Sequence, residues 1–476
     1  MRYLKLLVIG LSVIYLFCCH EAFAQTEDEE CPDCPPKERE RVKLDDVFVH
    51  AFHGGAVTIT PTKTIVDIEK FGKSGSVERV EDILMHLTGI DLMRGSTGAD
   101  PQSVIMMRGF DDSRFTIAID GRPITAPTAG ADTYVDWSSL TTGDIEKIEV
   151  IRGGASALYE NSQGGVINII TRKGTKRETL VPKITLRSGY TRFETYLERI
   201  AVDGGTGDLT YFGNFGYKES EGYLRNNDWR GRDYSARLSY SFPFQGNVTL
   251  SYKASELDLG YPVVNDPNRA DYDSDYPKVY EDADSLRKYR NLSYPGGNSE
   301  KNKETNHLDL IFEQPIGDGT FTFQLFQTRG EEDSWSYEMN SDGDLVQKYS
   351  GGEDREEQQQ GGRLQYHFDL WKDNSLTIGY DHRRMEVAST KDIYRIQAGY
   401  FEDIWAITHN LSLSLGLRYI HVREYSYPFA DASSTEKYRH LIYTKELLPK
   451  STLHYRVSPE TEFYISANRD YRVPGC

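Results

Sequence analysis

Residues 411–419 read LSLSLGLRY, with leucine or tyrosine at every second position and serine, glycine or arginine between them. Successive side chains of a β-strand point to opposite faces, so this pattern predicts a strand with one apolar and one polar face. The same alternation recurs in residues 209–217, 234–242, 247–254 and 376–380. A tight hairpin turn is predicted at Asp318-Gly319. From about residue 177 onward we therefore expect an antiparallel sheet of many strands.

The amino-acid composition helps to decide which class of β-sheet protein this is. The chain of 476 residues has 41 Gly, 32 Tyr, 38% hydrophobic residues and a mean hydropathy of −0.58, which excludes a bundle of apolar membrane helices. A water-soluble β-sandwich would alternate in the same way. Here the polar positions hold Ser, Thr, Asn, Gly and charges, and aromatic residues recur near strand ends. This favours a transmembrane barrel with a wet lumen and an apolar outer band, which must close because lipid cannot satisfy an open sheet edge.

The N-terminus has the features of an export signal. Two basic residues precede an apolar run over residues 6–17, and residues 22–24 (Ala-Phe-Ala) offer a cleavage site. The run is too short for a transmembrane helix. We predict a signal peptide over residues 1–24 and, together with the barrel, a location in a Gram-negative outer membrane.

The charge balance and the cysteines argue against other classes of function. There are 55 Lys and Arg against 73 Asp and Glu, a net charge of −18, whereas a nucleic-acid partner requires concentrated positive charge. A polar tail contains the motif CPDC at residues 31–34, which fits a passive disulfide, metal capture or redox chemistry. No second CxxC and no nucleophile–base pair accompanies it. We therefore predict no enzyme and no required cofactor.

Residues 44–176 have the pattern of a compact α/β domain. Apolar residues follow helical spacing at Val77, Val80, Ile83, Leu84 and Leu87. Short apolar runs bounded by glycine or turn residues predict strands at 103–107, 115–119, 145–151 and 166–171. About 130 residues are enough for a core of their own.

Five segments of this domain stand out in order: 107–110 (MRGF), 119–121 (IDG), 145–153 (IEKIEVIRG), 156–159 (SALY) and 164–171 (GGVINIIT). Together they resemble the plug domain of TonB-dependent outer-membrane receptors. The family's barrel strands are similar to residues 400–405, 416–419, 449–450 and 468–474. The resemblance implies a mainly β fold, a transmembrane antiparallel β-barrel with an N-terminal mixed α/β plug. It divides the chain into a signal peptide (1–24), a periplasmic tail with the TonB box (25–52), a plug (53–176) and a partial barrel (177–476).

The chain departs from the family pattern in two ways. Gly154 and Glu160 stand where the plug usually has proline and glycine, and we interpret both as turn variations. The motif Arg472-Val473-Pro474 ordinarily lies well inside the barrel, yet the chain stops two residues later. A plugged barrel has about 22 strands, whereas residues 177–476 supply about 13 or 14. We therefore expect a chain truncated at its C-terminus and an incomplete barrel.

The resemblance implies a TonB box before the plug. This extended segment would add a strand to the periplasmic C-terminal domain of TonB, with main-chain hydrogen bonds supplying affinity. The alternative is a plain β-strand leading into the plug. The predicted box comprises Asp45, Asp46, Val47, Phe48, Val49, His50 and Ala51.

Charges next to plug strands and glycine turns are candidates for holding the plug in the barrel: Arg108, Glu149 and Arg152. The resemblance implies that arginines such as Arg108 and Arg152 pair with barrel carboxylates. The alternative is ordinary surface charge.

A ligand would bind on the outer side, at plug loops 95–102 and 125–134 and at long barrel loops. Small and hydroxylated side chains suit hydrogen bonds to a polar metal chelate, although they suit any surface loop as well. The candidates are Ser96, Thr97, Asp100, Gln102, Thr128, Asp132 and Tyr134.

One predicted barrel loop is acidic, with Asp271, Asp273 and Asp275 at alternating positions. This spacing resembles the start of a calcium loop, but Tyr276 stands where an EF-hand requires glycine. Either calcium orders this extracellular loop or the loop is simply solvated.

The resemblance implies a TonB-energised transporter, for a ferric siderophore above all, with cobalamin or haem as competitors. Its partners would be TonB, a metal chelate and outer-membrane lipid. The alternatives are a non-transporting surface receptor and an inactive truncated product. A porin is disfavoured, because a plug would fill its lumen.

Overall fold

The computed structural model describes residues 56–59, 63–71, 79–93, 104–124, 126–127, 133–152, 156–179, 181–280, 300–339, 345–348, 355–371, 373–387, 392–426, 439–458 and 461–471. The chain forms two compact units, residues 1–43 and 44–476, and every described residue lies in the second. The predicted signal peptide, tail and TonB box lie outside the described residues. Within the described ranges, no helix is long and apolar enough to cross a membrane.

The plug is built around a six-stranded sheet with the order β1-β2-β9-β10-β5-β6. Strands β10 and β5 pair in parallel, and the other neighbours pair antiparallel. The strands are β1 (Val57–Ile59), β2 (Lys63–Asp67), β5 (Thr116–Ile119), β6 (Arg122–Pro123), β9 (Ile145–Arg152) and β10 (Gly165–Thr171). The strands predicted at 115–119, 145–151 and 166–171 are thus confirmed.

Smaller elements complete the plug. Two hairpins stand apart from the main sheet, β3 (Ile90–Met93) with β4 (Val104–Met107) and β7 (Ala126–Pro127) with β8 (Thr133–Tyr134). The helices are α2 (Ile68–Phe71), α3 (Val80–Leu84) and the 3-10 turns η2 (Asp112–Arg114), η3 (Trp137–Ser139) and η4 (Thr142–Asp144). The helix predicted from the spacing of Val80, Ile83 and Leu84 is therefore present as α3.

The plug has its own apolar core. Its members come from both helices and from the central strands, and they include Phe71, Ile83, Ile117, Trp137 and Ile148. Each of these residues has at most 1% of its surface exposed. Burying apolar side chains is the main favourable term in folding, so the plug is stabilised from within.

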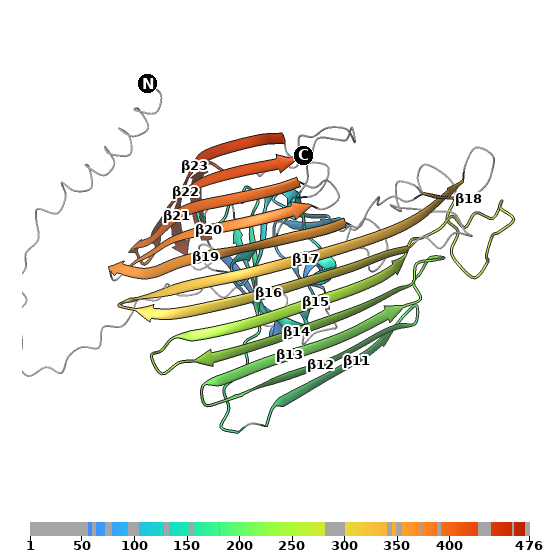
Figure 1. Ribbon diagram of the computed structural model, residues 1–476, viewed down its shortest axis with the longest axis horizontal. Helices are drawn as coiled ribbons and strands as arrows, with labels where there is room; N and C mark the ends of the chain where they lie inside the picture. The colour runs from blue at the N-terminus through green and yellow to red at the C-terminus, as the bar shows by residue number, and fades with distance from the viewer. Residues whose placement is uncertain are drawn as a thin grey trace, which may run out of the picture. The chain divides into compact units, whose positions relative to one another are not determined.

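The second part of the chain forms one large antiparallel sheet. Consecutive strands are neighbours throughout, except that β18 pairs only with β17 (Figure 1). The strands are β11 (Lys183–Thr191), β12 (Thr195–Thr206), β13 (Leu209–Ser220), β14 (Trp229–Ser241), β15 (Asn247–Gly260), β16 (Glu300–Ile316), β17 (Gly319–Met339), β18 (Leu345–Lys348), β19 (Arg355–Trp371), β20 (Asn374–Val387), β21 (Asp392–Thr408), β22 (Leu411–Ser426), β23 (Arg439–Ser458) and β24 (Thr461–Asn468). The sheet has 14 strands with β18 included, which agrees with the predicted 13 or 14.

The predicted hairpin turn lies one residue earlier than expected. Strands β16 and β17 close between Ile316 and Gly319, so Gly317 and Asp318 form the turn. Gly317 has φ +61°, the left-handed conformation that two-residue hairpin turns need at their first central position and that glycine adopts at no steric cost. The turn therefore uses Gly317 rather than Gly319.

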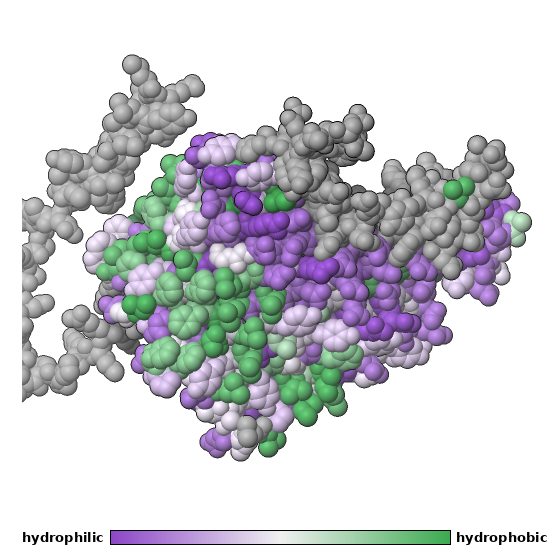
Figure 2. Space-filling model, in the orientation of Figure 1, coloured by the Kyte–Doolittle hydropathy of each residue, from purple (hydrophilic) through white to green (hydrophobic). Residues whose placement is uncertain are grey.

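The two faces of the sheet differ in polarity, as the alternation predicts. In β22, Ser412, Ser414 and Arg418 are buried, whereas Leu415 and Tyr419 are exposed. Exposed apolar side chains continue across the sheet at Leu238, Leu250, Leu308, Leu325, Leu364, Ile378, Phe401 and Leu447. Figure 2 shows hydrophobic side chains gathered over the sheet away from its β18 end, which is hydrophilic. An apolar outer face over a polar inner face is the signature of a transmembrane barrel.

The two ends of the strands also differ. At one end, turns of two residues join the strands, at 207–208, 317–318 and 409–410. At the other end lie the long connections 261–299 and 427–438. Outer-membrane barrels have short periplasmic turns and long extracellular loops, which assigns the two ends. In the described part of the chain, β11 and β24 each pair with one neighbour and form the two edges of the sheet.

Candidate functional site

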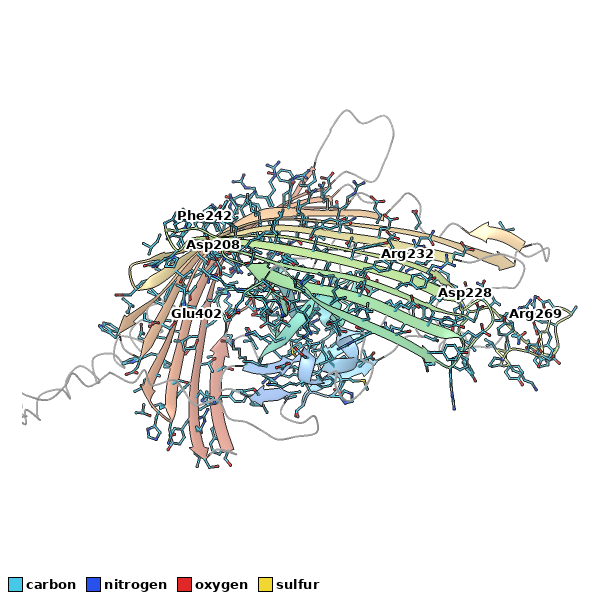
Figure 3. The ribbon with its side chains drawn as sticks, turned by 90° about the horizontal axis from the view of Figure 1, so that it is seen from below. Asp208, Asp228, Arg232, Phe242, Arg269 and Glu402 are labelled. Carbon is cyan, nitrogen blue, oxygen red and sulfur yellow. The ribbon has the colours of Figure 1, made fainter. Side chains whose placement is uncertain are left out.

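The buried face of the large sheet lies against the plug. Figure 3 shows the sheet curving, with the plug elements on its concave side. Because the strand alternation places polar residues on this face, charged side chains of the barrel meet the plug directly. The buried barrel cations are Arg199, Arg237, Lys253, Lys301, Lys303, Arg363, Arg383, Arg418 and Lys450. We call the polar contacts between plug and barrel the contact zone, and we treat it as the candidate functional site.

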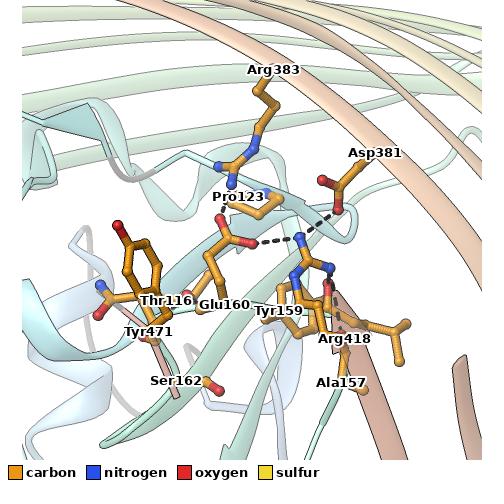
Figure 4. A network of polar contacts seen from close by, with 12 residues as sticks. Thr116, Pro123, Ala157, Tyr159, Glu160, Ser162, Asp381, Arg383, Arg418 and Tyr471 are labelled. Atoms are coloured by element: carbon orange, nitrogen blue, oxygen red, sulfur yellow. Dashed lines mark hydrogen bonds and ion pairs between the residues drawn. The ribbon is translucent and has the colours of Figure 1, made fainter. Parts of the chain in front are cut away.

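Glu160 lies in a buried network of polar contacts within the contact zone (Figure 4). Its carboxylate forms an ion pair with Arg383, and its Oε2 accepts a hydrogen bond from Arg418 Nη2 at 2.6 Å. The same Arg418 nitrogen is 2.8 Å from Oδ2 of Asp381. The Arg418 side chain has 0% and the Glu160 side chain 7% of its surface exposed. Two guanidinium groups and two carboxylates thus neutralise one another, as charges removed from water require.

Barrel cations also bind backbone carbonyls of the plug. Arg363 donates to the carbonyl of Leu158 at 2.7 Å and to that of Gly121. Lys450 donates to the carbonyl of Tyr159 at 3.1 Å. The segment 156–162 has no helix or strand of its own, so its backbone groups need partners from elsewhere. The barrel supplies them.

Barrel carboxylates accept hydrogen bonds from backbone amides of the same segment. The amide of Ala157 donates to Glu402 Oε2 at 2.6 Å. Both the amide and the hydroxyl of Ser162 donate to Asp470 Oδ2 at 2.8 Å, and Lys450 donates to the Ser162 hydroxyl at 2.6 Å. Segment 156–162 is therefore anchored to the barrel near both of its ends.

Two tyrosine rings cover the guanidinium groups of this region. Arg363 lies 5.6 Å from the ring centre of Tyr159 and 5.5 Å from that of Tyr400. Arg418 lies 5.3 Å from the Tyr400 ring. Such contacts stabilise cations that have lost water. Burial raises the pKa of Tyr159 to about 12, so its phenol is neutral at physiological pH.

The rest of the contact zone sets further plug carboxylates against barrel cations. The pairs are Asp120 with Arg237 at 2.7 Å, Asp144 with Lys253 at 2.7 Å and Asp136 with Lys303 at 3.6 Å. Arg122 forms the opposite kind of pair, because its guanidinium donates to both carboxylate oxygens of Asp309 at 2.8 and 3.0 Å. The expected polarity, plug arginines on barrel carboxylates, therefore holds at Arg122 and is reversed at four plug carboxylates, those of residues 120, 136, 144 and 160.

The three predicted plug-holding residues lie in different surroundings. Arg108 donates to the phenol of Tyr464 on β24 at 3.0 Å, so its barrel contact is a hydroxyl rather than a carboxylate. Glu149 pairs within the plug, with Lys63 on the adjacent strand β2 and with Lys147 on the same face of β9, each at 3.0 Å. Burial raises the pKa of Glu149, but the two lysines outweigh it and leave the pKa below its ordinary value. Arg152 ends β9, and its side chain lies outside the description.

Most of the predicted binding residues lie outside the described ranges. This applies to all seven TonB-box residues and to Ser96, Thr97, Asp100, Gln102, Thr128 and Asp132. Tyr134 belongs to β8, but its side chain is not described. The ligand-binding assignments therefore stay predictions.

The acidic loop is folded around an asparagine. Asn265 is 1% exposed, and its side-chain amide donates to the carbonyl of Asp273 at 2.8 Å and accepts from the amide of Asp273 at 3.0 Å. The carboxylate of Asp271 binds Arg269 at 3.0 Å, and that of Asp273 caps the amide of Asp275 at 2.9 Å. In the part of the chain that the structure describes, no three acidic, His or Cys side chains lie together as metal ligands. The calcium assignment stays a prediction.

The sequence analysis assigned no contact with the barrel to Asp120, Asp136, Asp144 or Glu160, and it interpreted Glu160 as a turn variation. All four stand in or beside turns and have no periodic pattern. A signal was present for the barrel residues that contact segment 156–162. Arg418, Lys450, Glu402 and Asp470 all lie in the barrel segments that resemble the family, 416–419, 449–450, 400–405 and 468–474. These segments, which resemble family strands, hold the plug.

Comparison with known families decides the identity of the fold. The model of the TonB-dependent receptor plug domain matches residues 57–166, and the model of the TonB-dependent receptor-like β-barrel matches residues 181–475. The protein belongs to the TonB-dependent receptor family. It is therefore an outer-membrane protein, and the curated relatives that it resembles are receptors rather than enzymes.

Curated relatives of this TonB-dependent receptor match part of it. The ferric enterobactin receptor PirA of Pseudomonas aeruginosa is 28% identical over 193 residues, which are 38% of this chain and 25% of the relative. The probable TonB-dependent siderophore receptor PirA of Acinetobacter baumannii is 30% identical over 180 residues, 35% of this chain and 23% of the relative.

Solved structures share the fold over most of the receptor. The FrpB iron transporter of Neisseria meningitidis superposes with a TM-score of 0.64 at 13% identity, covering 88% of this chain and 65% of that one. The siderophore receptor PirA of Acinetobacter baumannii gives a TM-score of 0.60 at 16% identity, with coverage of 87% and 61%. The chain thus spans less than two thirds of the length of these relatives.

Proposed function

We propose that this receptor is an active transporter that takes a ferric siderophore across the outer membrane and draws its energy from TonB. The family supports the TonB dependence, and the printed functions of the curated relatives support the siderophore. Cobalamin and haem are the competing ligands. The transporter catalyses no chemical reaction, so its work is binding and a change of plug position.

The observation that carries the proposal is the contrast between the plug's interior and its contact zone. The interior is apolar, with Ile117, Trp137 and Ile148 fully enclosed. The contact zone consists of hydrogen bonds and ion pairs, such as those of Glu160 and Lys450. Water can replace polar contacts at little net cost, whereas it cannot replace apolar packing. A pulling force therefore separates the plug from the barrel wall before it unfolds the apolar core of the plug.

The proposed cycle begins at the long-loop end of the barrel. The ligand binds there, at plug loops 95–102 and 125–134. TonB adds a strand to residues 45–51 on the short-turn side and pulls. The anchors of segment 156–162 then exchange for water, and a path opens along the charged inner face of the sheet.

Uptake of iron-55 chelates in cells without other receptors of this class tests the proposal. Val47→Pro removes an amide and fixes φ, which blocks strand addition, so uptake should fall to the level of a TonB-deficient strain. Val47→Thr is the matched control, because threonine also favours strands and should preserve uptake. If Val47→Pro transports as well as the wild type, the TonB box is misassigned. If the wild type takes up no chelate in a TonB-competent strain, the transporter proposal fails.

The second candidate is a receptor that binds a ligand without passing it on. It is favoured by one observation: in the described part of the chain, β11 and β24 lack a second neighbour, and an open edge is costly in lipid. The same assay separates the two candidates, because this alternative predicts surface-bound iron that never enters the cell.

A further inference from the structure

Four basic side chains lie together on the lipid-facing side of strands β20 to β23. Arg384 is the register partner of Arg395, and Arg395 is the register partner of Arg423. The three arginines therefore form one row across three adjacent strands. Lys445 of β23 is the register partner of His421. His421 lies two residues before Arg423 on β22 and therefore on the same face of the sheet. We call Arg384, Arg395, Arg423 and Lys445 the basic row.

The strand alternation places this row on the outer face. Arg395, Arg423 and Lys445 are exposed, whereas their sequence neighbours Ile396 and Val422 are fully buried on the inner face. The basic row thus lies on the face of the sheet opposite to the plug and the lumen, and it is separate from the contact zone.

The residues beside the row indicate at which depth of the membrane it lies. On its short-turn side, Tyr380, Tyr419 and Leu447 are 43%, 47% and 47% exposed, and further exposed apolar residues follow, among them Phe401 and Leu415. The long connection that follows β22 begins a few residues beyond the row on its other side. Tyrosines mark the boundary between the hydrocarbon and the headgroups of a membrane. The basic row therefore lies at the headgroup level of the outer leaflet.

Among the described residues, a carboxylate balances one of the four charges of the row. Within the described ranges, Arg384 pairs with Glu386 at 2.5 Å, and no carboxylate forms an ion pair with Arg395, Arg423 or Lys445. These three lie beside tyrosine rings: Arg395 lies 5.5 Å from Tyr425, Arg423 5.8 Å from Tyr443 and Lys445 5.0 Å from Tyr443. Arg423 also donates to Nε2 of His421 at 3.3 Å.

Other exposed arginines of the sheet show a different arrangement. Arg232 is 3.0 Å from Glu256, and Arg329 is 2.7 Å from Glu331. These pairs cross-link or brace neighbouring strand positions in the usual way. Within the described ranges, Arg395, Arg423 and Lys445 have no such carboxylate partner, which distinguishes these three members of the basic row from the paired arginines.

Like charges directly opposite each other in a sheet are destabilising. Adjacent strands are about 4.8 Å apart, so Arg395 faces an arginine on each side at short range. An anion bound over the row attracts each of these arginines and so offsets the repulsion between them. The guanidinium group binds phosphate through two parallel hydrogen bonds, which makes phosphate the anion that the row fits best.

We propose that the basic row binds the phosphate groups of a phosphorylated lipid in the outer leaflet. The row extends over two strand spacings, roughly 10 Å, which is room for more than one phosphate. The apolar and aromatic residues directly below it, Tyr419, Leu447 and Phe401 among them, offer a surface for acyl chains. A free phosphate ion would use the arginines without this surface, and so the site fits a lipid.

Binding is tested with the full chain purified in a non-ionic detergent, using diphosphorylated lipid A as the probe. At about 1 kcal/mol for each basic residue near an anionic lipid surface, the variant R395Q/R423Q/K445Q should bind about 100-fold more weakly than the wild type. The matched control R232Q/R329Q removes two arginines of the same exposed kind that have carboxylate partners, and its affinity should equal that of the wild type. Phosphate-free lipid A and inorganic phosphate alone are the two comparison probes.

A second variant guards against loss of folding. Arg423→Gln relieves the repulsion with Arg395, so in lipid-free detergent its Tm should equal or exceed that of the wild type, whereas its gain in Tm on adding diphosphorylated lipid A should be smaller. Equal lipid affinity of the wild type and the triple variant would overturn the proposal, as would equal binding of phosphate-free lipid A. If inorganic phosphate alone reproduces the whole stabilisation, the site is a phosphate site and the lipid assignment is wrong.

Discussion

Residues of the contact zone differ in how strongly the stability of the plug depends on them, and we expect the dependence to be greatest for Glu160. Its carboxylate lies against two buried arginines, Arg383 and Arg418. Removal of one partner from a buried ionic group leaves charge without compensation, at about 3–5 kcal/mol. We predict that Glu160→Gln lowers the free energy of plug unfolding by about 3 kcal/mol, measured by hydrogen exchange of β10 amides in a urea series.

The control for this prediction is Glu256→Gln. Glu256 also pairs with an arginine, Arg232, but both side chains are 40% exposed, and exposed pairs contribute below about 1 kcal/mol. A Glu160→Gln variant that unfolds at the same urea concentration as Glu256→Gln would show that the buried network does not hold the plug.

Glu149 predicts a pH dependence of plug stability. The two lysines leave its folded pKa below the ordinary value of 4.5, so its ionised form stabilises the folded plug above pH 4.5. This stabilisation is lost as the pH falls through the folded pKa. Because Lys63 and Lys147 are about a third exposed, the effect is limited to about 1 kcal/mol.

The test compares thermal unfolding of the wild type and Glu149→Gln at pH 7 and at pH 3. The wild type should be the more stable at pH 7, and the difference should be smaller at pH 3, because the carboxylate of Glu149 becomes protonated as the pH falls through its folded pKa. A difference that is unchanged at low pH would assign the role of Glu149 to packing instead of charge.

At this scale the sequence predicted residue types better than partners. Arg418 and Lys450 lie in segments that resembled the family, yet nothing local shows that Arg418 meets Glu160, which is 258 positions away. Pairing across such distances depends on the barrel register and on where the plug sits. The pairs of plug carboxylates with barrel cations were not predicted for the same reason, since a charge beside a turn can face either a cation or an anion.

At the scale of elements, segment 156–162 depends on its anchors instead of on its own hydrogen bonds. Lys450→Met removes the donor to Tyr159 and Ser162 and the charge opposite Asp470. We predict that amide exchange within 156–162 accelerates at least tenfold, about 1.4 kcal/mol of local stability, as measured by hydrogen-exchange mass spectrometry.

Lys445→Met is the matched control, because Lys445 belongs to the same strand but is exposed on the opposite face. It should leave exchange in 156–162 unchanged. Acceleration of the same size in both variants would mean that the mutations act on strand β23 as a whole and that Lys450 is no specific anchor.

Strands were predicted well because a period of two is a direct consequence of one wet and one apolar face. Residues 411–419 became part of β22, and 145–151 became β9. The turn of β16 and β17 was displaced by one residue, since the choice between Gly317 and Gly319 depends on which one must adopt φ +61°. Hairpin register is a property of two strands together, and a single strand does not contain it.

At the scale of the whole molecule, the receptor combines two kinds of stability. The plug has an apolar core of its own, and the sheet has an apolar outer face toward lipid. Between them lies a polar contact zone in which ion pairs replace packing. The parts can therefore separate without either one losing its main source of stability, which is what transport by plug movement requires.

The central claim is that the plug must leave its contacts with the barrel for the ligand to pass. A disulfide between Ala157→Cys and Gly416→Cys tests it most directly, because a Cβ at Gly416 would lie 2.7 Å from the Cβ of Ala157, so the two positions need to move apart by about 1 Å to reach the Cβ separation of a disulfide. We predict that TonB-dependent chelate uptake is lost in oxidised cells, returns on addition of a reductant, and is unaffected by oxidation in either single-cysteine variant. Equal uptake before and after reduction of a fully formed disulfide would contradict the account.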